Sequence, residues 1–154
     1  MPPKNSSIKF YRTPGFPKEL GDLIQKFKTY YLARPNSHTS FGKDCVLHKP
    51  PNVVSAAICH THVFSEKMCS EKKIIWKKRR LNLLHRRGAS NSMIIYAVSN
   101  VGNVYLLAFY EEGAHANIEN ESILAQLVDY AETAMSQNQE TPMSHQQLLD
   151  LLSA

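Results

Sequence analysis

Two histidines separated by one threonine, His60 and His62, are the residues whose type and spacing most directly suggest chemistry. They lie in the apolar, β-branched run VVSAAICHTHVF (residues 53–64), which predicts a β-strand. Alternate side chains of a strand share a face, so we expect both imidazoles on one face. Histidine titrates near neutral pH, which makes the pair a candidate for proton transfer. Two other interpretations stay open: hydrogen bonding at a sheet margin, and metal binding with Cys59 or Cys69, although no second cluster at ligand spacing accompanies the pair.

The second feature is the sequence KKIIWKKRRLNLLHRR (residues 72–87), which holds eight Lys and Arg and no acidic residue. Such a run favours contact with a polyanion, with a solvated loop or linker as the alternative. We expect a basic loop in which Trp76 either stacks on a base or anchors the loop to the core. The candidate nucleic-acid contacts are Lys72, Lys73, Trp76, Lys77, Lys78, Arg79, Arg80 and Arg86.

Charge is divided along the chain. All 18 Lys and Arg lie within residues 1–110 together with five acidic residues, whereas residues 111–154 hold the other eight of the 13 acids. This asymmetry is typical of a protein whose basic part faces nucleic acid. The acidic end is then either a separate surface for a partner or a segment that folds back and partly neutralises the basic one.

The remaining composition limits the class of protein. The chain has no apolar run long enough to span a bilayer, and its first residues, MPPKNSSIKFYR, lack the hydrophobic segment of a signal peptide. Cys45, Cys59 and Cys69 are odd in number and form no CxxC pair, which argues against a disulfide framework and a thiolate zinc site. We therefore expect a cytoplasmic protein with free thiols, no cofactor and no membrane contact.

Apolar patterns predict the elements that position these residues. Residues 8–13 (IKFYRT) alternate as in a short strand, and an apolar stripe over residues 17–31 predicts a helix. Residues 37–52 contain FGKD and two adjacent prolines and predict a loop with at most one turn of helix. The runs 92–99 and 103–110, joined by Asn-Val-Gly, predict a hairpin at the centre of an antiparallel sheet whose two faces are covered.

Two helices are expected after the hairpin. Asn120 can cap a helix that reaches about Gln137, and its apolar stripe would cover one face of the sheet. Residues 144–152 (SHQQLLDLL) predict a short amphipathic helix that is either packed on the domain or frayed. The order predicts one α+β domain over residues 1–137, an antiparallel sheet packed with helices, and an acidic C-terminal extension over residues 138–154.

Six motifs follow one another over residues 8–137: IKFYRT before a helix, FGKD at 41–44, HTH at 60–62, a basic stretch ending at Arg87, SMIIYA, and YLLAFYEEGAH before a helix. In order and spacing they resemble the YafO family of bacterial type II toxins. The resemblance implies a RelE/ParE-like toxin architecture and activity as a ribosome-dependent mRNA endonuclease. It also implies mRNA, the ribosome and a cognate antitoxin as partners.

RNA cleavage by the 2′-OH needs a base, an acid and positive charge where the phosphorane develops, and it requires no metal. His60 and His62 are the candidates for the base and the acid, and Arg87, with Arg86 beside it, can meet the phosphate bidentately. His85 and His115 are further candidates for proton transfer, and His115 stands at a position that matches the family pattern; it could instead only stabilise the entry to the last helix. Tyr96 matches a family tyrosine but is expected in the core. Asp44 is expected to cap a loop, and Ser90 stands where the family pattern has an acidic residue.

Two other classes of function remain open. A non-catalytic nucleic-acid-binding regulator would need the cations of residues 72–87 but not the histidines. A small interaction module would use its acidic end to bind a basic partner and would contact no nucleic acid.

Overall fold

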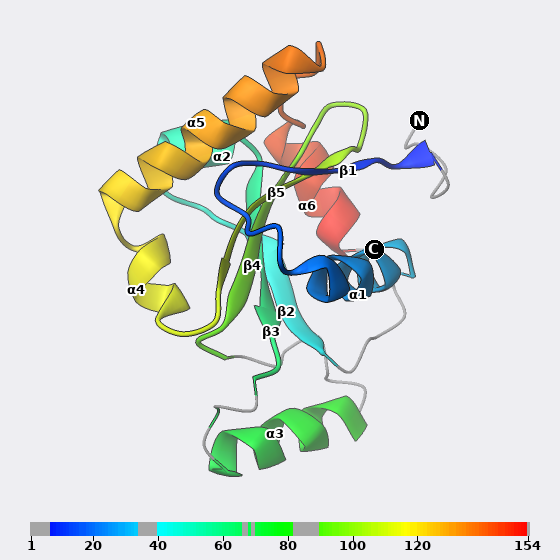
Figure 1. Cartoon of the computed structure of the whole chain (residues 1–154), viewed down its shortest axis with the longest axis vertical. Helices are drawn as coiled ribbons and strands as arrows, with labels where there is room; N and C mark the ends of the chain where they lie inside the picture. The colour runs from blue at the N-terminus through cyan, green and yellow to red at the C-terminus, as the bar shows by residue number, and fades with distance from the viewer. Residues whose placement is uncertain (1–6, 34–39, 66–67, 69, 82–89, 154) are drawn as a thin grey trace.

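The computed structural model describes residues 7–33, 40–65, 68, 70–81 and 90–153, and for residues 78–81 and 153 the backbone only. The chain runs through β1 (Phe10–Arg12), α1 (Gly21–Leu32), β2 (Phe41–Val46), α2 (Pro51–Ser55), β3 (Ile58–Val63), α3 (Ser70–Leu81), β4 (Met93–Val98), β5 (Val104–Tyr110), α4 (Ala114–Ile118), α5 (Glu121–Gln137) and α6 (His145–Ser153) (Figure 1). No helix in these ranges is long and apolar enough to cross a membrane.

The five strands form one sheet in the order β1-β5-β4-β3-β2. The pairs β5–β4, β4–β3 and β3–β2 are antiparallel, as expected, but β1 runs parallel to β5, so the sheet is mixed. The expectation of a purely antiparallel sheet was wrong at this edge. Strand β1 is not joined to β5 by a hairpin, because α1 leads the chain away to β2 at the opposite edge, and a hairpin would have enforced the antiparallel direction.

Helices cover both faces of the sheet, as the continuous apolarity of β4 and β5 requires (Figure 1). On one face α2 and α5 pack on buried residues that include Ile58, Ile95 and Leu107. On the other, α1 and α6 pack on a second cluster that includes Phe27, Tyr96 and Leu106. The hairpin and the α5 helix are confirmed, and Asn120 caps α5 by accepting a hydrogen bond from the Ile123 backbone N–H at 3.1 Å.

Two segments before β3 differ from expectation. The predicted loop over residues 37–52 contains β2, and the predicted strand over residues 53–64 begins only at Ile58 because α2 precedes it. Proline at the first position of α2 is compatible with the start of a helix, since that position needs no N–H donor. Ala57, with φ of 57°, then turns the chain from α2 into β3.

The last helix packs on the sheet, which decides between the two alternatives for residues 144–152. Leu148 of α6 is fully buried in the cluster beneath α1. The segment before α6 is held to the strand end, because Met143 N–H donates to the Val98 carbonyl at 2.9 Å. The C-terminal segment therefore contributes to the core on this face.

Gly15 lies between β1 and α1 where the chain approaches β5 and α5 closely. A Cβ at this position would lie 2.3 Å from the backbone oxygen of Leu107 and 2.8 Å from the Tyr130 ring. Because a backbone oxygen cannot swing aside, Gly15→Ala should destabilise the fold by about 1–3 kcal/mol. The control is Gly21→Ala, where nothing lies within 4 Å, and there we expect no loss or a gain of up to about 1 kcal/mol. Urea unfolding measures both, and an unchanged midpoint for Gly15→Ala would contradict the close approach.

Candidate active site

His60 and His62 lie on β3 and share the face that α2 and α5 cover. Their register partners on β4 are Ile95 and Met93, both members of the core cluster on that face. The two imidazole centroids are 5.4 Å apart, which confirms the expected common face. Both rings are largely covered, with 8% of His60 and 3% of His62 exposed.

His115, the second residue of α4, extends this pair toward solvent. Its ring centroid lies 5.6 Å from that of His62, and its side chain is exposed. The three residues His60, His62 and His115 therefore form a histidine row that begins inside the sheet face and ends at the surface. Two of them come from the His-Thr-His sequence at residues 60–62, and the third comes from a segment more than 50 residues later.

Asn91 fixes the exposed end of the histidine row. Its Oδ1 atom accepts the His115 backbone N–H at 2.9 Å and lies 3.0 Å from the His115 Nδ1 atom. Since Oδ1 can only accept, Nδ1 must carry the proton. In the neutral ring this leaves Nε2 as the atom that can take up a proton.

Ser90 holds His62 through its backbone. The His62 Nδ1 atom lies 2.9 Å from the Ser90 N–H and 2.8 Å from the Ser90 carbonyl oxygen. A neutral ring can accept from the N–H, and an imidazolium can donate to the carbonyl, so both protonation states find a partner. Ser90 is itself buried, and its hydroxyl lies within hydrogen-bond distance of the Val63 and Ser92 carbonyls. A backbone contact thus supports His62 at the position where the family pattern has an acidic residue.

Cys45 lies beside His60. It is the register partner of His60 on β2, and its Sγ atom is 3.4 Å from the His60 Nε2 atom. Burial raises the pKa of the Cys45 thiol, although the Lys43 charge opposes this. The sulfur therefore stays protonated near neutral pH and is a weak hydrogen-bonding partner for the imidazole, not a thiolate nucleophile.

Burial sets the protonation of the two inner rings. It lowers the pKa of His60 to about 4, with further lowering by His62, and it lowers the pKa of His62 to about 4 against the opposing hydrogen bond from the Ser90 backbone. At neutral pH both rings are uncharged. Each ring is therefore in the form that can accept a proton, although a pKa near 4 makes it a weak base, and it would donate a proton only after taking one from the reaction or from a neighbour.

These lowered pKa values make the fold sensitive to acid. Between pH 6.5 and about 4 the unfolded chain binds protons on His60 and His62 that the folded chain does not, so stability should fall across this window. The loss should be on the order of 1–2 kcal/mol per ring at pH 5. Urea unfolding at pH 7 and pH 5 measures it. The double variant His60→Gln/His62→Asn should lose stability less steeply, and an identical pH dependence would refute the assignment.

We expected the basic stretch to be a loop. Where the structure describes it, it is a helix, since residues 70–81 form α3. Lys and Arg are good helix formers, and Glu71 lies in the first turn, where a negative charge favours the helix dipole. Helix α3 lies beyond the end of the sheet where β3 finishes and β4 begins (Figure 1). Lys72 and Lys77 are exposed and Lys73 is half-buried.

Trp76 anchors α3. Only 4% of its surface is exposed, and its ring meets Phe64 at a centroid distance of 5.7 Å in an edge-to-face arrangement. The structure thus favours the anchor interpretation over stacking on a base, because the ring is covered. The side chains of Lys78, Arg79 and Arg80, and the whole of His85, Arg86 and Arg87, lie outside the described residues.

Asp44 and Tyr96 have structural roles on the opposite face of the sheet. Tyr96 is fully buried, and its hydroxyl donates to Asp44 at 2.6 Å, as does the hydroxyl of Tyr30 from α1. Tyr96 is thus the core residue that we expected. Asp44 does not cap a loop; it lies in β2 and joins that strand to α1 and β4.

Sequence reasoning missed three contacts of the site: the Asn91 side chain, the Ser90 backbone and the Cys45 thiol. Each depends on segments that meet only in the folded sheet, and no local motif marks them. Among the residues that the structure describes, no three His, Cys, Asp or Glu side chains are grouped so that they could hold a metal ion.

The fold is thus an α+β domain whose mixed sheet carries the histidine row, with the lysine-bearing helix α3 following β3 in the chain. The family model described as "Toxin YafO, type II toxin-antitoxin system" matches residues 28–136, which include the whole histidine row and α3. The chain therefore belongs to the YafO toxin family and has a cognate antitoxin as its implied partner. A search of curated proteins and a search of solved structures found no match. The RelE/ParE-like architecture accordingly stays a prediction.

Proposed function

We propose that this toxin is a metal-independent endoribonuclease that cuts mRNA on the ribosome and thereby inhibits translation. The observation that carries the proposal is the histidine row, which aligns three proton-transfer groups from β3 and α4 with centroid distances of 5.4 and 5.6 Å. Membership of the YafO family supports a toxin role. The exposed cations of α3 support contact with an RNA backbone.

His115 is the member of the row that meets the RNA in this proposal, because it is the exposed one. Its Nε2 atom takes the proton of the 2′-OH as that oxygen attacks the adjacent phosphorus. His62 and His60 stand behind it as uncharged, weakly basic rings. His85 remains a candidate donor to the leaving 5′-oxygen, and Arg86 and Arg87 remain candidates to neutralise the phosphorane.

A test of this function uses a defined mRNA incubated with the purified protein, with and without translating ribosomes. Primer extension should reveal cuts only when ribosomes are present, and expression of the protein should arrest growth. Equal cutting of free RNA would contradict the dependence of cleavage on the ribosome. Intact mRNA under both conditions would contradict the proposed nuclease activity.

The second candidate is a non-catalytic nucleic-acid-binding regulator. It is favoured by the burial of His60 and His62, since a covered histidine is often structural. This candidate needs α3 but not the histidine row. It predicts that the variant His60→Gln/His62→Asn keeps every activity of the protein.

Both candidates use α3, whose contribution can be measured by salt dependence. Replacing Lys72 and Lys77 with alanine should weaken binding to single-stranded RNA and should make it less sensitive to salt. Each lost phosphate contact removes about 0.7 from the magnitude of the slope of log K against log salt, so the pair should remove about 1.4. Fluorescence anisotropy over a range of KCl concentrations measures this slope. The control is Lys18→Ala/Lys26→Ala, two exposed lysines near and on α1, and equal slopes for both pairs would exclude α3 as the principal contact.

A further inference from the structure

Helix α3 exposes two neighbouring isoleucines. Ile74 is 54% exposed and Ile75 is 44% exposed, and in the part of the chain that the structure describes the only other large apolar side chain so exposed is Val101. An RNA phosphate gains nothing from an aliphatic side chain, so contact with RNA does not account for this pair. Adjacent exposed apolar residues with charged neighbours are typical of a surface that binds protein.

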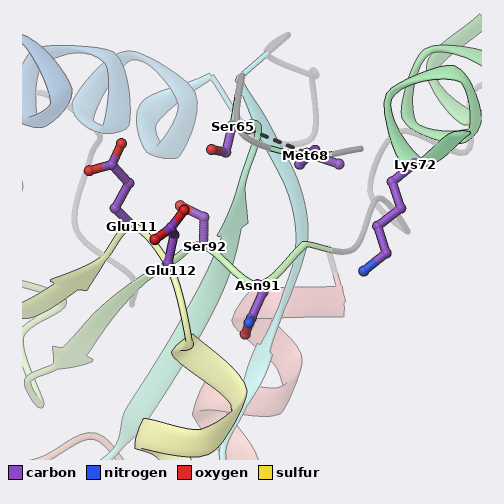
Figure 2. A pocket seen from close by; sticks show the side chains of 7 residues that line it. All are labelled: Ser65, Met68, Lys72, Asn91, Ser92, Glu111 and Glu112. Carbon is purple, nitrogen blue, oxygen red and sulfur yellow. Dashed lines mark hydrogen bonds between the residues drawn. The ribbon is translucent and has the colours of Figure 1, made fainter. Parts of the chain in front are cut away.

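Lysines flank the two isoleucines. Successive residues of a helix are about 100° apart, which places the exposed Lys77 beside Ile74. By the same rotation the exposed Lys72 lies beside Ile75, and the buried Trp76 lies on the far side of the helix. Figure 2 shows the Lys72 side chain extending from α3. The outer surface of α3 is therefore an isoleucine ridge, formed by Ile74 and Ile75, with one lysine along each side.

A second surface has the complementary shape. A pocket of about 350 Å³ lies between the start of α2, the end of α4 and the start of α5. It is lined by the apolar residues Pro50, Ile118 and Leu124 and by the charged residues Lys49, Glu119 and Glu121. Ligand pockets begin at roughly 300 Å³, so this one has room for aliphatic side chains.

The charges of the pocket are opposite to those of the ridge. Glu119 and Glu121 are exposed at the pocket and can face the two lysines of the ridge. Among the described residues, neither carboxylate has an ion-pair or hydrogen-bond partner. Each surface also carries one charge of the other sign, Lys49 at the pocket and Glu71 one turn before the isoleucines, and these two attract each other as well.

The ridge and the pocket belong to different parts of the molecule. Figure 1 shows α3 beyond one end of the sheet, whereas α4 and the start of α5 lie beside the sheet. Within one copy of the chain, α3 therefore does not cover the pocket. A second copy can bring the two surfaces together.

We propose that the isoleucine ridge of one copy docks into the pocket of a second copy, so that molecules of this protein associate head to tail. The contact buries both isoleucines and pairs the lysines of α3 with Glu119 and Glu121. Because the two surfaces differ, the contact is heterologous, and a docked pair still offers one ridge and one pocket to further copies. A docked α3 is covered and cannot lie on RNA. Only this last consequence rests on the proposed function.

Sedimentation of the full chain from low micromolar to several hundred micromolar protein tests the association. The average mass of wild type should rise above that of one chain as the concentration increases. The affinity should fall several-fold between about 50 and 500 mM KCl, because salt screens the charge pairs. Wild type that stays monomeric, which would leave the ridge to a different partner, overturns the inference.

Two variants and a control locate the contact. The ridge variant Ile74→Gln/Ile75→Gln keeps good helix formers on α3, and the pocket variant Glu119→Lys/Glu121→Lys reverses two exposed charges. Each should sediment as one chain at every concentration. The control Asp129→Asn/Glu132→Gln changes exposed acids farther along α5 and should associate like wild type. Ridge or pocket variants that associate like wild type overturn the inference.

Mixing the two variants tests whether the ridge and the pocket meet each other. The ridge variant keeps its pocket and the pocket variant keeps its ridge, so an equimolar mixture should form a dimer with one intact contact and nothing larger. A mixture that stays monomeric would show that the two surfaces do not meet, and it too overturns the inference. These measurements use neither RNA nor cleavage, so their outcome is independent of the proposed nuclease function.

Discussion

Replacing His115 with asparagine should lower the single-turnover rate of ribosome-dependent mRNA cleavage by about 10²- to 10⁴-fold, the range that a general acid–base group contributes. The asparagine amide can still donate to Asn91 Oδ1 in place of Nδ1–H, but it has no atom that can take up the proton of the 2′-OH. Because His115 is exposed, the fold should be unaffected. Quenched primer extension at saturating protein measures the rate.

The matched control for this prediction is His48→Asn, which alters an exposed histidine outside the histidine row. It should cleave at the wild-type rate. A His115→Asn protein that cuts within threefold of wild type would show that His115 transfers no proton. The wild-type protein should also fail to cleave an mRNA with one 2′-deoxynucleotide at the cut site, since the attacking 2′ oxygen is then missing.

The largest loss of stability should come from Asp44→Ala. Asp44 accepts short hydrogen bonds from Tyr30 and Tyr96, each at 2.6 Å, and so links β2 to α1 and β4. A hydrogen bond to a carboxylate contributes about 1.5–3 kcal/mol, so the loss of two should cost roughly 3–6 kcal/mol. We expect the lower part of that range because Asp44 is only half-buried. Urea unfolding followed by circular dichroism measures the change.

Two comparisons make the Asp44 result specific. Tyr30→Phe and Tyr96→Phe each remove one of the two hydrogen bonds and should each cost about half as much. Asp129→Ala, at an exposed position of α5, should stay within about 0.5 kcal/mol of wild type. A loss below 1 kcal/mol for Asp44→Ala would mean that the two hydroxyl contacts do not stabilise the fold.

The parts of the fold that the sequence predicted well have strong local patterns. The runs that became β4 and β5 are almost continuously apolar, and Asn120 stands directly before the periodic stripe of α5. For the same reason, the common face of His60 and His62 followed from strand alternation alone. In these elements local preference and tertiary packing agree.

The parts of the fold that the sequence predicted poorly depend on contacts between distant segments. The FGKD sequence has little strand character, yet β2 forms because it pairs with β3 and buries Phe41 and Val46. The basic stretch was expected as a loop, whereas residues 70–81 form helix α3, which the packing of Trp76 on Phe64 holds in place. The parallel pairing of β1 with β5 has no local signal at all.

The candidate site was predicted in the same uneven way. The sequence pointed to the members of the histidine row, but His115 entered through the family resemblance and not through its own surroundings. The burial that lowers the pKa of His60 and His62 to about 4 could not be inferred from a two-residue spacing. The contact of Asn91 with His115 follows only from the packing of α4 against the start of β4.

The most direct test of the central claim compares wild type with His60→Gln/His62→Asn by primer extension on mRNA bound to translating ribosomes. Glutamine and asparagine keep a polar atom near His60 Nε2 and His62 Nδ1, so contacts with Cys45 and Ser90 are retained while both titratable rings are removed. We predict cuts with wild type and none with the variant, which should still bind ribosomes. If the folded variant cuts mRNA as well as wild type does, the account is contradicted, and His60 and His62 have only a structural role in the core.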